Sequence, residues 1–303
     1  MKMQSRSRGL RELCRLLGYS PQAYYQYQKL SGKQAQEEDL LIGQVLHHRI
    51  FQPRLGGRKL HEMMESFMKD HNIYVGRDLL FGLLRENDLL VSKRKRRKPR
   101  TTDSNHWLKR YPDLIRNIVL SRPEELWVSD ITYIRLFNSV FAYLSLITDA
   151  YSRKIVGFCM NNDLSSNGPI TALEMALKAR VNNKPLIHHS DRGSQYCSDG
   201  YIALLKSNTI SISMTQSGNP RDNAIAERVN GILKQELLEE VYPNIKQAQQ
   251  AAIIAIDTYN RIRPHSSVDM MPPDKAHWQT GQIKRRWKNA FKPNSYKQKE
   301  EVQ

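Results

Sequence analysis

Residues 126–137 read LWVSDITYIRLF, and this stretch decides the fold of the chain. It is rich in the β-branched and aromatic residues that favour strands. Two further stretches of the same character, 140–148 and 153–160, follow after short turns at 138–139 and 150–152. Three consecutive strands joined by tight turns predict an antiparallel meander.

The sequence after residue 160 alternates between helical and strand patterns. Ser165 or Ser166 offers an N-cap for a helix that continues to residue 181. The alternation predicts an α/β fold, in which a mixed sheet carries helices on its faces. The remaining predicted elements are a strand at 185–190, a helix at 199–207, a strand at 210–214, a helix at 221–240 and a helix at 246–260.

The N-terminal third is predicted to be helical throughout. Gly18 ends a first short helix, and Ser20 and Pro21 start a second one that contains three tyrosines. Two short helices joined by a glycine-containing turn indicate a helix-turn-helix, but an ordinary helical hairpin with its tyrosines packed inward fits the same pattern. Three more helices are predicted at 40–50, 58–68 and 76–86.

The chain has 303 residues and a formal net charge of +17, from 47 Lys and Arg against 30 Asp and Glu. This excess attracts a polyanion, so nucleic acid is the expected partner, and a basic surface without a specific partner is the alternative. Three cysteines are too few for a disulfide framework, and the N-terminus lacks the apolar stretch of a signal peptide. No apolar run of about 20 residues is present. We therefore expect a cytoplasmic protein that does not enter a membrane.

Residues 93–100 read KRKRRKPR, with seven basic side chains in eight positions. Like charges at this density repel one another, so the segment is expected to contact a polyanion rather than to serve as a plain charged spacer. The DNA-binding residues expected here are Lys93, Arg94, Lys95, Arg96, Arg97, Lys98 and Arg100.

Three carboxylates occur where such a sheet can bring them together. Asp130 lies inside the apolar strand at 126–137, where a charge needs a partner or a cation. Asp191 ends the fourth strand, and Glu227 lies within the helix at 221–240. Taken singly, each acid is more often a strand-edge charge, a turn former or a surface helix charge. Taken together, their oxygens suit Mg²⁺ or Mn²⁺ rather than zinc.

The strings around these acids share one pattern, with 35 residues between Asp191 and Glu227. The set resembles the OrfB-type DDE transposases of bacterial insertion sequences, the insertion-sequence-three family, whose catalytic core is shared with retroviral integrases. The likeness covers the chain from about residue 10 to residue 273. The motifs that carry it are WVSDITYI at 127–134, DAYSRKIVG at 149–157, HHSDRGSQY at 188–196, SGNPRDNAIAERVNGILKQEL at 217–237, and YNRIRPH at 259–265, followed by Pro272-Pro273.

The resemblance implies a ribonuclease H-like integrase core with two divalent ions, Mg²⁺ or Mn²⁺. Such an enzyme cleaves the ends of an insertion sequence and transfers the 3′-hydroxyl into target DNA. Asp130 is expected to bridge both metals, while Asp191 and Glu227 each bind chiefly one. Lys234 matches a basic position of the family motif and is expected to contact terminal DNA phosphates.

Further DNA contacts are expected in the N-terminal helical part, although Leu55 stands where the family usually has a Tyr-Gly-containing string. The implied partners are double-stranded terminal repeats and target DNA, further copies of the chain on that DNA, and an upstream-frame fusion partner. The other DNA-binding candidates are Arg228, Asn230, Arg58, Lys59 and Arg77. The predicted ranges are a helix-turn-helix-like segment at 1–36, a helical DNA-binding module at 37–92, a basic linker at 93–122, the integrase core at 123–283 and a basic tail at 284–303.

Two other classes of function stay open at this point. One is a catalytically silent DNA-binding regulator of transposition, and the other is a nuclease of the same fold that acts on RNA–DNA hybrids or junctions. Asp149 lies in a family motif without being one of its three ligands, so it is expected to be structural or to lie outside the ligand set. His188 and His189 point to opposite faces of a strand, so they are not expected to bind one ion. His188 is expected to pack, and His189 to face the same side as Asp191.

Overall fold

The computed structural model describes residues 9–92, 94, 107–116, 118–216 and 223–286. The chain divides into two compact units, Met1–Val91 and Ser92–Gln303, and each is described by itself. The finer domain ranges given above stay predictions.

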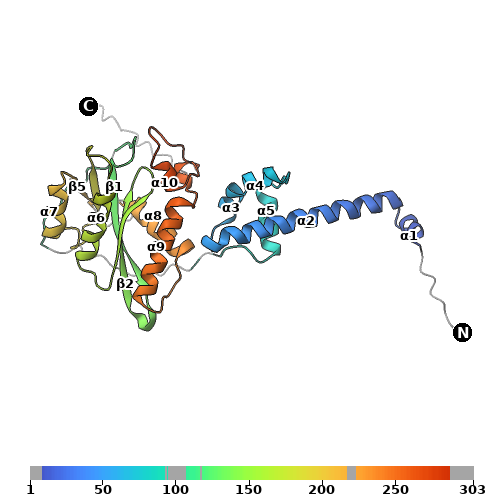
Figure 1. Ribbon diagram of the computed structural model, residues 1–303, viewed down its shortest axis with the longest axis horizontal. Coiled ribbons are helices and arrows are strands. Elements are labelled where there is room, and N and C mark those ends of the chain that lie inside the picture. Colours follow the sequence, from blue (N-terminus) through green and yellow to red (C-terminus); the bar gives the residue numbers. More distant parts are fainter. Residues whose placement is uncertain (1–8, 93, 95–106, 117, 217–222, 287–303) are drawn as a thin grey trace, which may run out of the picture. The chain divides into compact units, whose positions relative to one another are not determined.

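A five-stranded mixed sheet forms the centre of the second unit (Figure 1). β1 (Leu126–Arg135) pairs antiparallel with β2 (Phe141–Asp149), and β2 pairs antiparallel with β3 (Ile155–Asn161). On the other side of β1 lies β4 (Ile187–Ser190), parallel to it, followed by β5 (Ser211–Met214), parallel to β4. The strand order is therefore β3-β2-β1-β4-β5, and the predicted meander and mixed sheet are confirmed.

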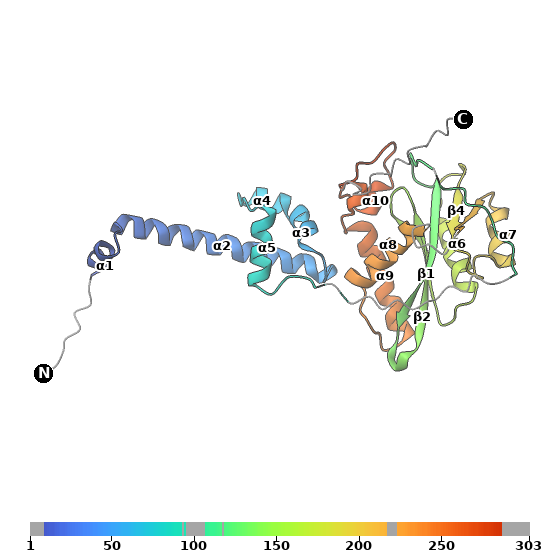
Figure 2. The same cartoon turned by 180° about the vertical axis from the view of Figure 1, so that it is seen from behind.

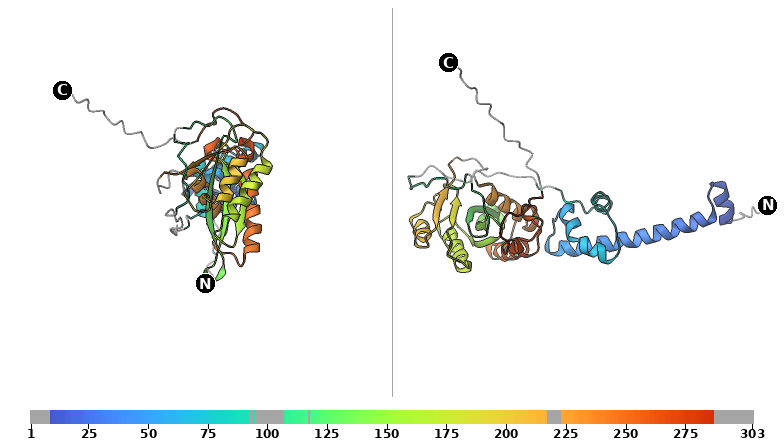
Figure 3. Two further views of the ribbon diagram at one scale, coloured as in Figure 1. Left: turned by 90° about the vertical axis from the view of Figure 1, so that its left-hand side faces the viewer. Right: turned by 90° about the horizontal axis from the view of Figure 1, so that it is seen from above.

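Helices cover both faces of this sheet (Figure 1, Figure 3). α6 (Asn167–Ala179) and α7 (Asp199–Ser207) pack on one face, and α8 (Ala224–Ile232) and α9 (Ile245–Arg261) pack on the other. The strand order and the helices on both faces define a ribonuclease H-like core, as predicted.

Side chains of β1 alternate between the two helical layers. Trp127 lies in the core under α6 and α7, whereas Val128 packs with Ala226 of α8. The layer under α6 is especially thin, because a Cβ atom at Gly157 of β3 would lie 2.1 Å from the carbonyl oxygen of Ala172. Asp130 has the same strand parity as Val128, so it belongs to the face covered by α8.

The helix that was predicted at 221–240 is shorter and irregular. α8 ends at Ile232 and is followed by a π-helical turn, labelled η3 (Leu233–Leu237), in which the N–H of Leu238 donates to the carbonyl oxygen of Leu233 at 2.8 Å. Residues 221 and 222 lie outside the described part of the chain. The remaining short elements are η1 (Phe137–Ser139), η4 (Ser266–Val268) and α10 (Pro273–Ala276).

The first unit contains five helices in its described part, residues 9–91 (Figure 2). The predicted separate helices around the tyrosines and at 40–50 form one continuous helix, which crosses the predicted boundary at residue 36. The helix predicted at 58–68 is split in two at Met64. The observed elements are α1 (Leu10–Leu16), α2 (Pro21–Phe51), α3 (Gly57–Met63), α4 (Glu65–Asp70) and α5 (Arg77–Glu86).

α2 begins where the sequence predicted. Its tyrosines exclude one of the two interpretations of this segment, the helical hairpin. Ser20 Oγ accepts a 3.0 Å hydrogen bond from the N–H of Ala23, with Pro21 at the first helical position. Tyr25 and Tyr27 are 59% and 71% exposed, so the hairpin with inward-packed tyrosines is wrong. No helix in the described part of the chain, including α2 with its 31 residues, is long and apolar enough to cross a membrane.

The C-terminal half of α2 packs with α3, α4 and α5 around an apolar core. Leu41 and Val45 of α2 lie in this core. Leu55, which departs from the family pattern, is also buried there and is 1% exposed. Leu55 is therefore an ordinary core residue, although it departs from the family pattern.

Candidate active site

Asp130 and Asp191 lie level with one another on neighbouring strands. β1 and β4 run parallel, with Val128 opposite His189. Each acid lies two residues beyond that pair, so the register aligns them on strands about 4.8 Å apart. Asp191 also follows directly after the last residue of β4, and the carboxyl ends of strands are where ligands bind in α/β sheets.

A tight loop holds the Asp191 carboxylate. Its Oδ1 accepts a 2.9 Å hydrogen bond from the N–H of Gly193. A Cβ atom at position 193 would lie 3.1 Å from that same oxygen and 2.9 Å from Oε1 of Gln195. The glycine is therefore required for close approach to the carboxylate.

Glu227 lies on α8, which covers the face of the sheet that carries Asp130. Just before α8, Nδ2 of Asn223 donates a 2.8 Å hydrogen bond to the carbonyl oxygen of Ser129. The start of the helix is thus tied to β1 one residue from Asp130. Glu227 itself is exposed, so its carboxylate is accessible to a ligand.

The three predicted acids share one electrostatic environment. Burial is the largest cause that raises the pKa of Asp130, to about 7, and the charges of Asp191 and Glu227 raise it further. Hydrogen bonds from Asn230 and from the N–H of Ile131 oppose the shift in this pKa. A divalent cation among the acids would relieve both the repulsion and the cost of burying the charge.

The acids do not form a closed coordination sphere in the described part of the chain. Within residues 9–92, 94, 107–116, 118–216 and 223–286, no three Asp, Glu, His or Cys side chains take up a geometry that could hold a metal ion. The donor set itself fits a hard divalent cation, because it consists of carboxylate oxygens, one of them on a desolvated side chain.

Asn230 contacts the central acid directly, a role that was not predicted from the sequence. Its Nδ2 donates a 2.7 Å hydrogen bond to Oδ2 of Asp130. Its Oδ1 is buried and has no hydrogen-bond partner among the described residues. Asn230 follows Glu227 by three residues and therefore lies on the same side of α8, which was the available signal. Its DNA contact stays a prediction.

Lys234 lies within electrostatic reach of Asp130. Partial burial lowers the pKa of its ammonium group, and the charge of Asp130 opposes that shift. Among the other DNA-contact candidates, Arg228, Arg58 and Arg77 are exposed, Lys59 is half-buried, and Arg94 contacts the end of η3. Lys93, Lys95, Arg96, Arg97, Lys98 and Arg100 lie outside the described residues.

The two histidines of β4 contact different neighbours. His188 Nε2 lies 2.6 Å from Oγ of Ser129 and 2.9 Å from the hydroxyl of Tyr201, and burial lowers the pKa of His188 to about 3. It is therefore neutral and packed in the core, as predicted. His189 Nδ1 lies 2.8 Å from Oγ of Ser213 on β5.

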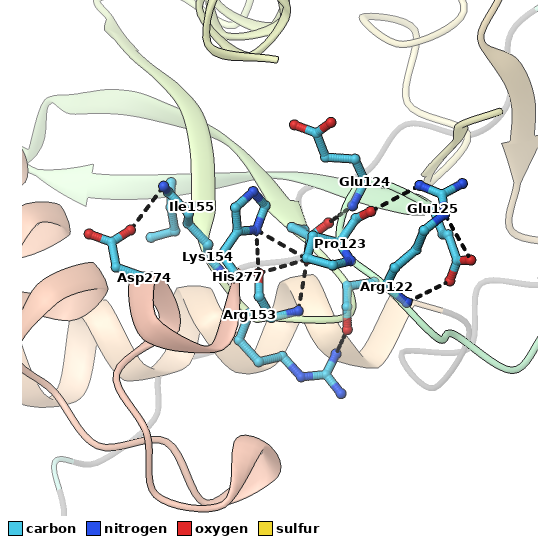
Figure 4. A network of polar contacts seen from close by, with 12 residues as sticks. Arg122, Pro123, Glu124, Glu125, Arg153, Lys154, Ile155, Asp274 and His277 are labelled. Atoms are coloured by element: carbon cyan, nitrogen blue, oxygen red, sulfur yellow. Dashed lines mark hydrogen bonds and ion pairs between the residues drawn. The ribbon is translucent and has the colours of Figure 1, made fainter. Parts of the chain in front are cut away.

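Asp149 is fully buried and structural. Its carboxylate accepts hydrogen bonds of 2.7 Å from the N–H of Glu124 and from both the N–H and Oγ of Ser152. His277 Nδ1 lies 2.9 Å from Oγ of Ser152, so this network joins the β2–β3 turn to the segment after α10 (Figure 4). In the register of β1 and β2, Asp149 lies three residues from the level of Asp130, about 10 Å along the strands.

Known proteins resemble this chain in sequence over most of its length. Two family profiles described as Integrase core domain match residues 121–220 and 208–273. The chain is 34% identical over 267 residues to the "Insertion element IS600 uncharacterized 31 kDa protein" of Shigella sonnei, a match that covers 86% of this chain and 96% of that protein. It is 29% identical to the "Transposase for insertion sequence element IS629" of the same organism, over 88% of this chain and 91% of the relative.

A solved structure with a similar core is the HTLV-2 integrase catalytic core domain in complex with magnesium. It is 20% identical, with a TM-score of 0.41, and the match covers 52% of this chain and 97% of that one. On the extent of the sequence matches, the chain belongs to the integrase-core transposases of bacterial insertion sequences. It is a DNA transposase, an enzyme that cuts DNA and transfers strands.

Replacing Asn230 with Ala is expected to shift the pH dependence of DNA cleavage. The hydrogen bond from Asn230 lowers the pKa of Asp130, so its loss raises that pKa, and a higher pH is needed to ionise the carboxyl group. The acidic limb of the rate profile should therefore move to higher pH. The Asn208→Ala variant, at the end of α7, serves as the control. Coincident profiles for the two variants would contradict the assignment.

Proposed function

We propose that Asp130, Asp191 and Glu227 are the catalytic carboxylates and that together they hold two Mg²⁺ or Mn²⁺ ions. The observation that carries this proposal is the parallel register of β1 and β4, which aligns Asp130 with Asp191, under a helix, α8, that carries Glu227 and covers the same face of the sheet. The raised pKa of Asp130, caused by burial and by the charges of the two other acids, supports it. A buried carboxyl group crowded by like charges is unfavourable until a cation or a proton neutralises it. Such an arrangement is typical of functional sites.

Each residue has a separate task in the proposed reaction. When bound, two ions supply activation of the attacking oxygen and stabilisation of the leaving oxygen of a DNA phosphodiester. Asp130 binds from the rigid strand β1, flanked by Asp191 at the end of β4 and Glu227 on α8. Asn230 holds one carboxylate oxygen of Asp130, which fixes the orientation of the other. Lys234 supplies positive charge for a terminal phosphate.

The proposed DNA substrates are the terminal repeats of the element, cut first, and a target duplex that the new 3′-hydroxyl attacks. The net charge of +17 favours sequence-independent binding to both. Arg58, Lys59 and Arg77 of the first unit are proposed phosphate contacts. Since two ends must be handled together, we expect at least two copies of the chain on DNA, and a monomer mass for the DNA-bound complex would exclude this. An upstream-frame fusion partner stays a prediction.

A joining assay tests the proposal. The full chain, mixed with labelled element-end DNA and a target duplex, is expected to give joined strands with Mg²⁺ or Mn²⁺ and none after chelation of the metal. A silent DNA-binding regulator binds the same ends and gives no product with any metal. That outcome would overturn the catalytic proposal.

Mg²⁺ is expected to raise the Tm of the wild-type chain in the absence of DNA. Binding to the folded acid cluster at about 100 times the Kd adds about 2.7 kcal/mol, or several degrees for a unit of this size. Asp130→Asn should abolish this shift, because it removes the central carboxylate of the set that would hold the ions. An equal Mg²⁺ shift in the variant would place the ion elsewhere.

The same variant has an expected effect in metal-free buffer. The pKa of Asp130 is raised in the folded state, so its ionisation lowers stability as the pH rises through about 7. Asp130→Asn should therefore have a higher Tm than the wild type at about pH 8, and the difference should shrink as the pH falls towards about 4. Asp257→Asn, an exposed acid on α9, should show neither effect.

A further inference from the structure

The helix that carries Glu227 changes its geometry just before Lys234. α8 ends at Ile232, and η3 from Leu233 to Leu237 is a π-helical turn. A π turn is rare and is found mostly as a single turn at functional sites. Two arginines from distant parts of the sequence contact this turn.

One side of the π turn is held by Arg263 of the YNRIRPH motif. Its Nε donates to Oε2 of Glu236 at 2.8 Å, and its second terminal nitrogen donates to Oε1 at 2.9 Å. The guanidinium carbon also lies 5.8 Å from the centre of the Tyr259 ring. Arg263 is 1% exposed, so this paired contact anchors η3 to the segment that follows α9.

The other side of the π turn is held by Arg94, from the basic segment. One terminal nitrogen of Arg94 donates to the carbonyl oxygens of Lys234 and Leu238, both at 2.7 Å. Its Nε lies 3.3 Å from the carboxylate of Glu240. Carbonyl groups at the end of a helix lack partners within the helix, and a positive charge there is stabilising.

These contacts distinguish Arg94 from a side chain that is free to bind a phosphate. Its donors are directed to main-chain oxygens, and its side chain is only 20% exposed. One of those oxygens belongs to Lys234, whose ammonium group is within reach of the charge of Asp130. A shift of Arg94 therefore changes the backbone from which Lys234 extends.

We propose that Arg94 is a positioning residue: it clamps the π turn and so fixes the placement of Lys234 near Asp130. The proposal rests on the proposed function, since Lys234 matters only if the acids act on DNA. It removes Arg94 from the set of simple phosphate contacts, because its hydrogen-bonding groups are directed to the end of η3.

A matched pair of variants of the full chain tests the clamp. Arg94→Gln and Arg100→Gln each remove one positive charge from the same basic segment. Amide hydrogen exchange of peptides covering residues 233–240 is expected to be about tenfold faster in Arg94→Gln and unchanged in Arg100→Gln. The single-turnover joining rate at saturating DNA should fall about tenfold in Arg94→Gln, with the Kd for DNA within about twofold of the wild-type value.

The opposite pattern would overturn the proposal. If Arg94→Gln weakens DNA binding, leaves the rate at saturation unchanged and does not alter exchange at 233–240, Arg94 is a phosphate contact. Arg94→Lys retains the charge and an ammonium donor, so it should recover part of the exchange protection. The exchange measurement needs no catalysis, and failure of the proposed function would appear instead as absence of joined product in the wild type. The two failures are therefore distinguishable.

Discussion

Asp191→Asn is expected to lower the rate of DNA joining about a thousandfold or more while the chain still binds DNA. The amide keeps the size of the side chain and can still accept from the N–H of Gly193, but it cannot supply a charged oxygen to a metal. Loss of about 4 kcal/mol of transition-state stabilisation corresponds to about a thousandfold in rate. Asp130→Asn and Glu227→Gln are expected to behave alike.

Single-turnover joining on element-end DNA, with binding followed separately, measures this effect. Asp257→Asn is the matched control, because Asp257 is exposed on α9 and pairs with Arg261 four residues on. Its rate should equal that of the wild type. Strand transfer retained in any one of the three variants would remove that acid from the catalytic set.

Arg263→Ala is expected to give the largest loss of stability. The change removes a buried guanidinium that binds both carboxylate oxygens of Glu236 and contacts the ring of Tyr259. Breaking a buried pair of this kind costs about 3 kcal/mol, which lowers the Tm by about 6–12 °C for a unit of this size. The π turn is expected to loosen first, since Glu236 lies within it.

Thermal unfolding of two neighbouring variants isolates the effect. Arg261→Ala removes an arginine that is 69% exposed and pairs with Asp257 within α9, so its Tm should stay within about 2 °C of the wild type. Arg263→Lys keeps the charge but not the paired N–H donors of the guanidinium group, so it should recover only part of the lost stability. Equal Tm values for the two alanine variants would show that the Glu236 contact contributes little.

The order of strands and helices in the second unit could be predicted because its signals are local. The apolar run at 126–137 became β1 (Leu126–Arg135), and the helix at 199–207 was found with the same limits. The level placement of Asp130 and Asp191 follows from the parallel pairing of β1 with β4. The sequence indicated only that a sheet of this kind can bring the acids together, whereas the pairing and its register are properties of the folded sheet.

The π turn could not be predicted because its partners are distant in sequence. Arg94 and Arg263 lie 140 and 27 residues from the groups they contact, Lys234 and Glu236. The helices expected separately around the tyrosines and at 40–50 form the single helix α2, which continues through Gly32. Glycine lowers helix propensity by only about 1 kcal/mol, which favourable flanking residues can offset.

The unbroken path of α2 has a geometric consequence for the first unit. Each residue of an α-helix turns by about 100° about the axis and advances by about 1.5 Å. Leu41 and Val45 lie in the core of the module, and the tyrosines lie earlier in the same helix. The number of residues between the two groups therefore sets the direction in which the exposed tyrosines point from the helix axis. One residue inserted near Gly32 would swing Tyr25 and Tyr27 by more than a quarter turn without disturbing a single core contact of the module.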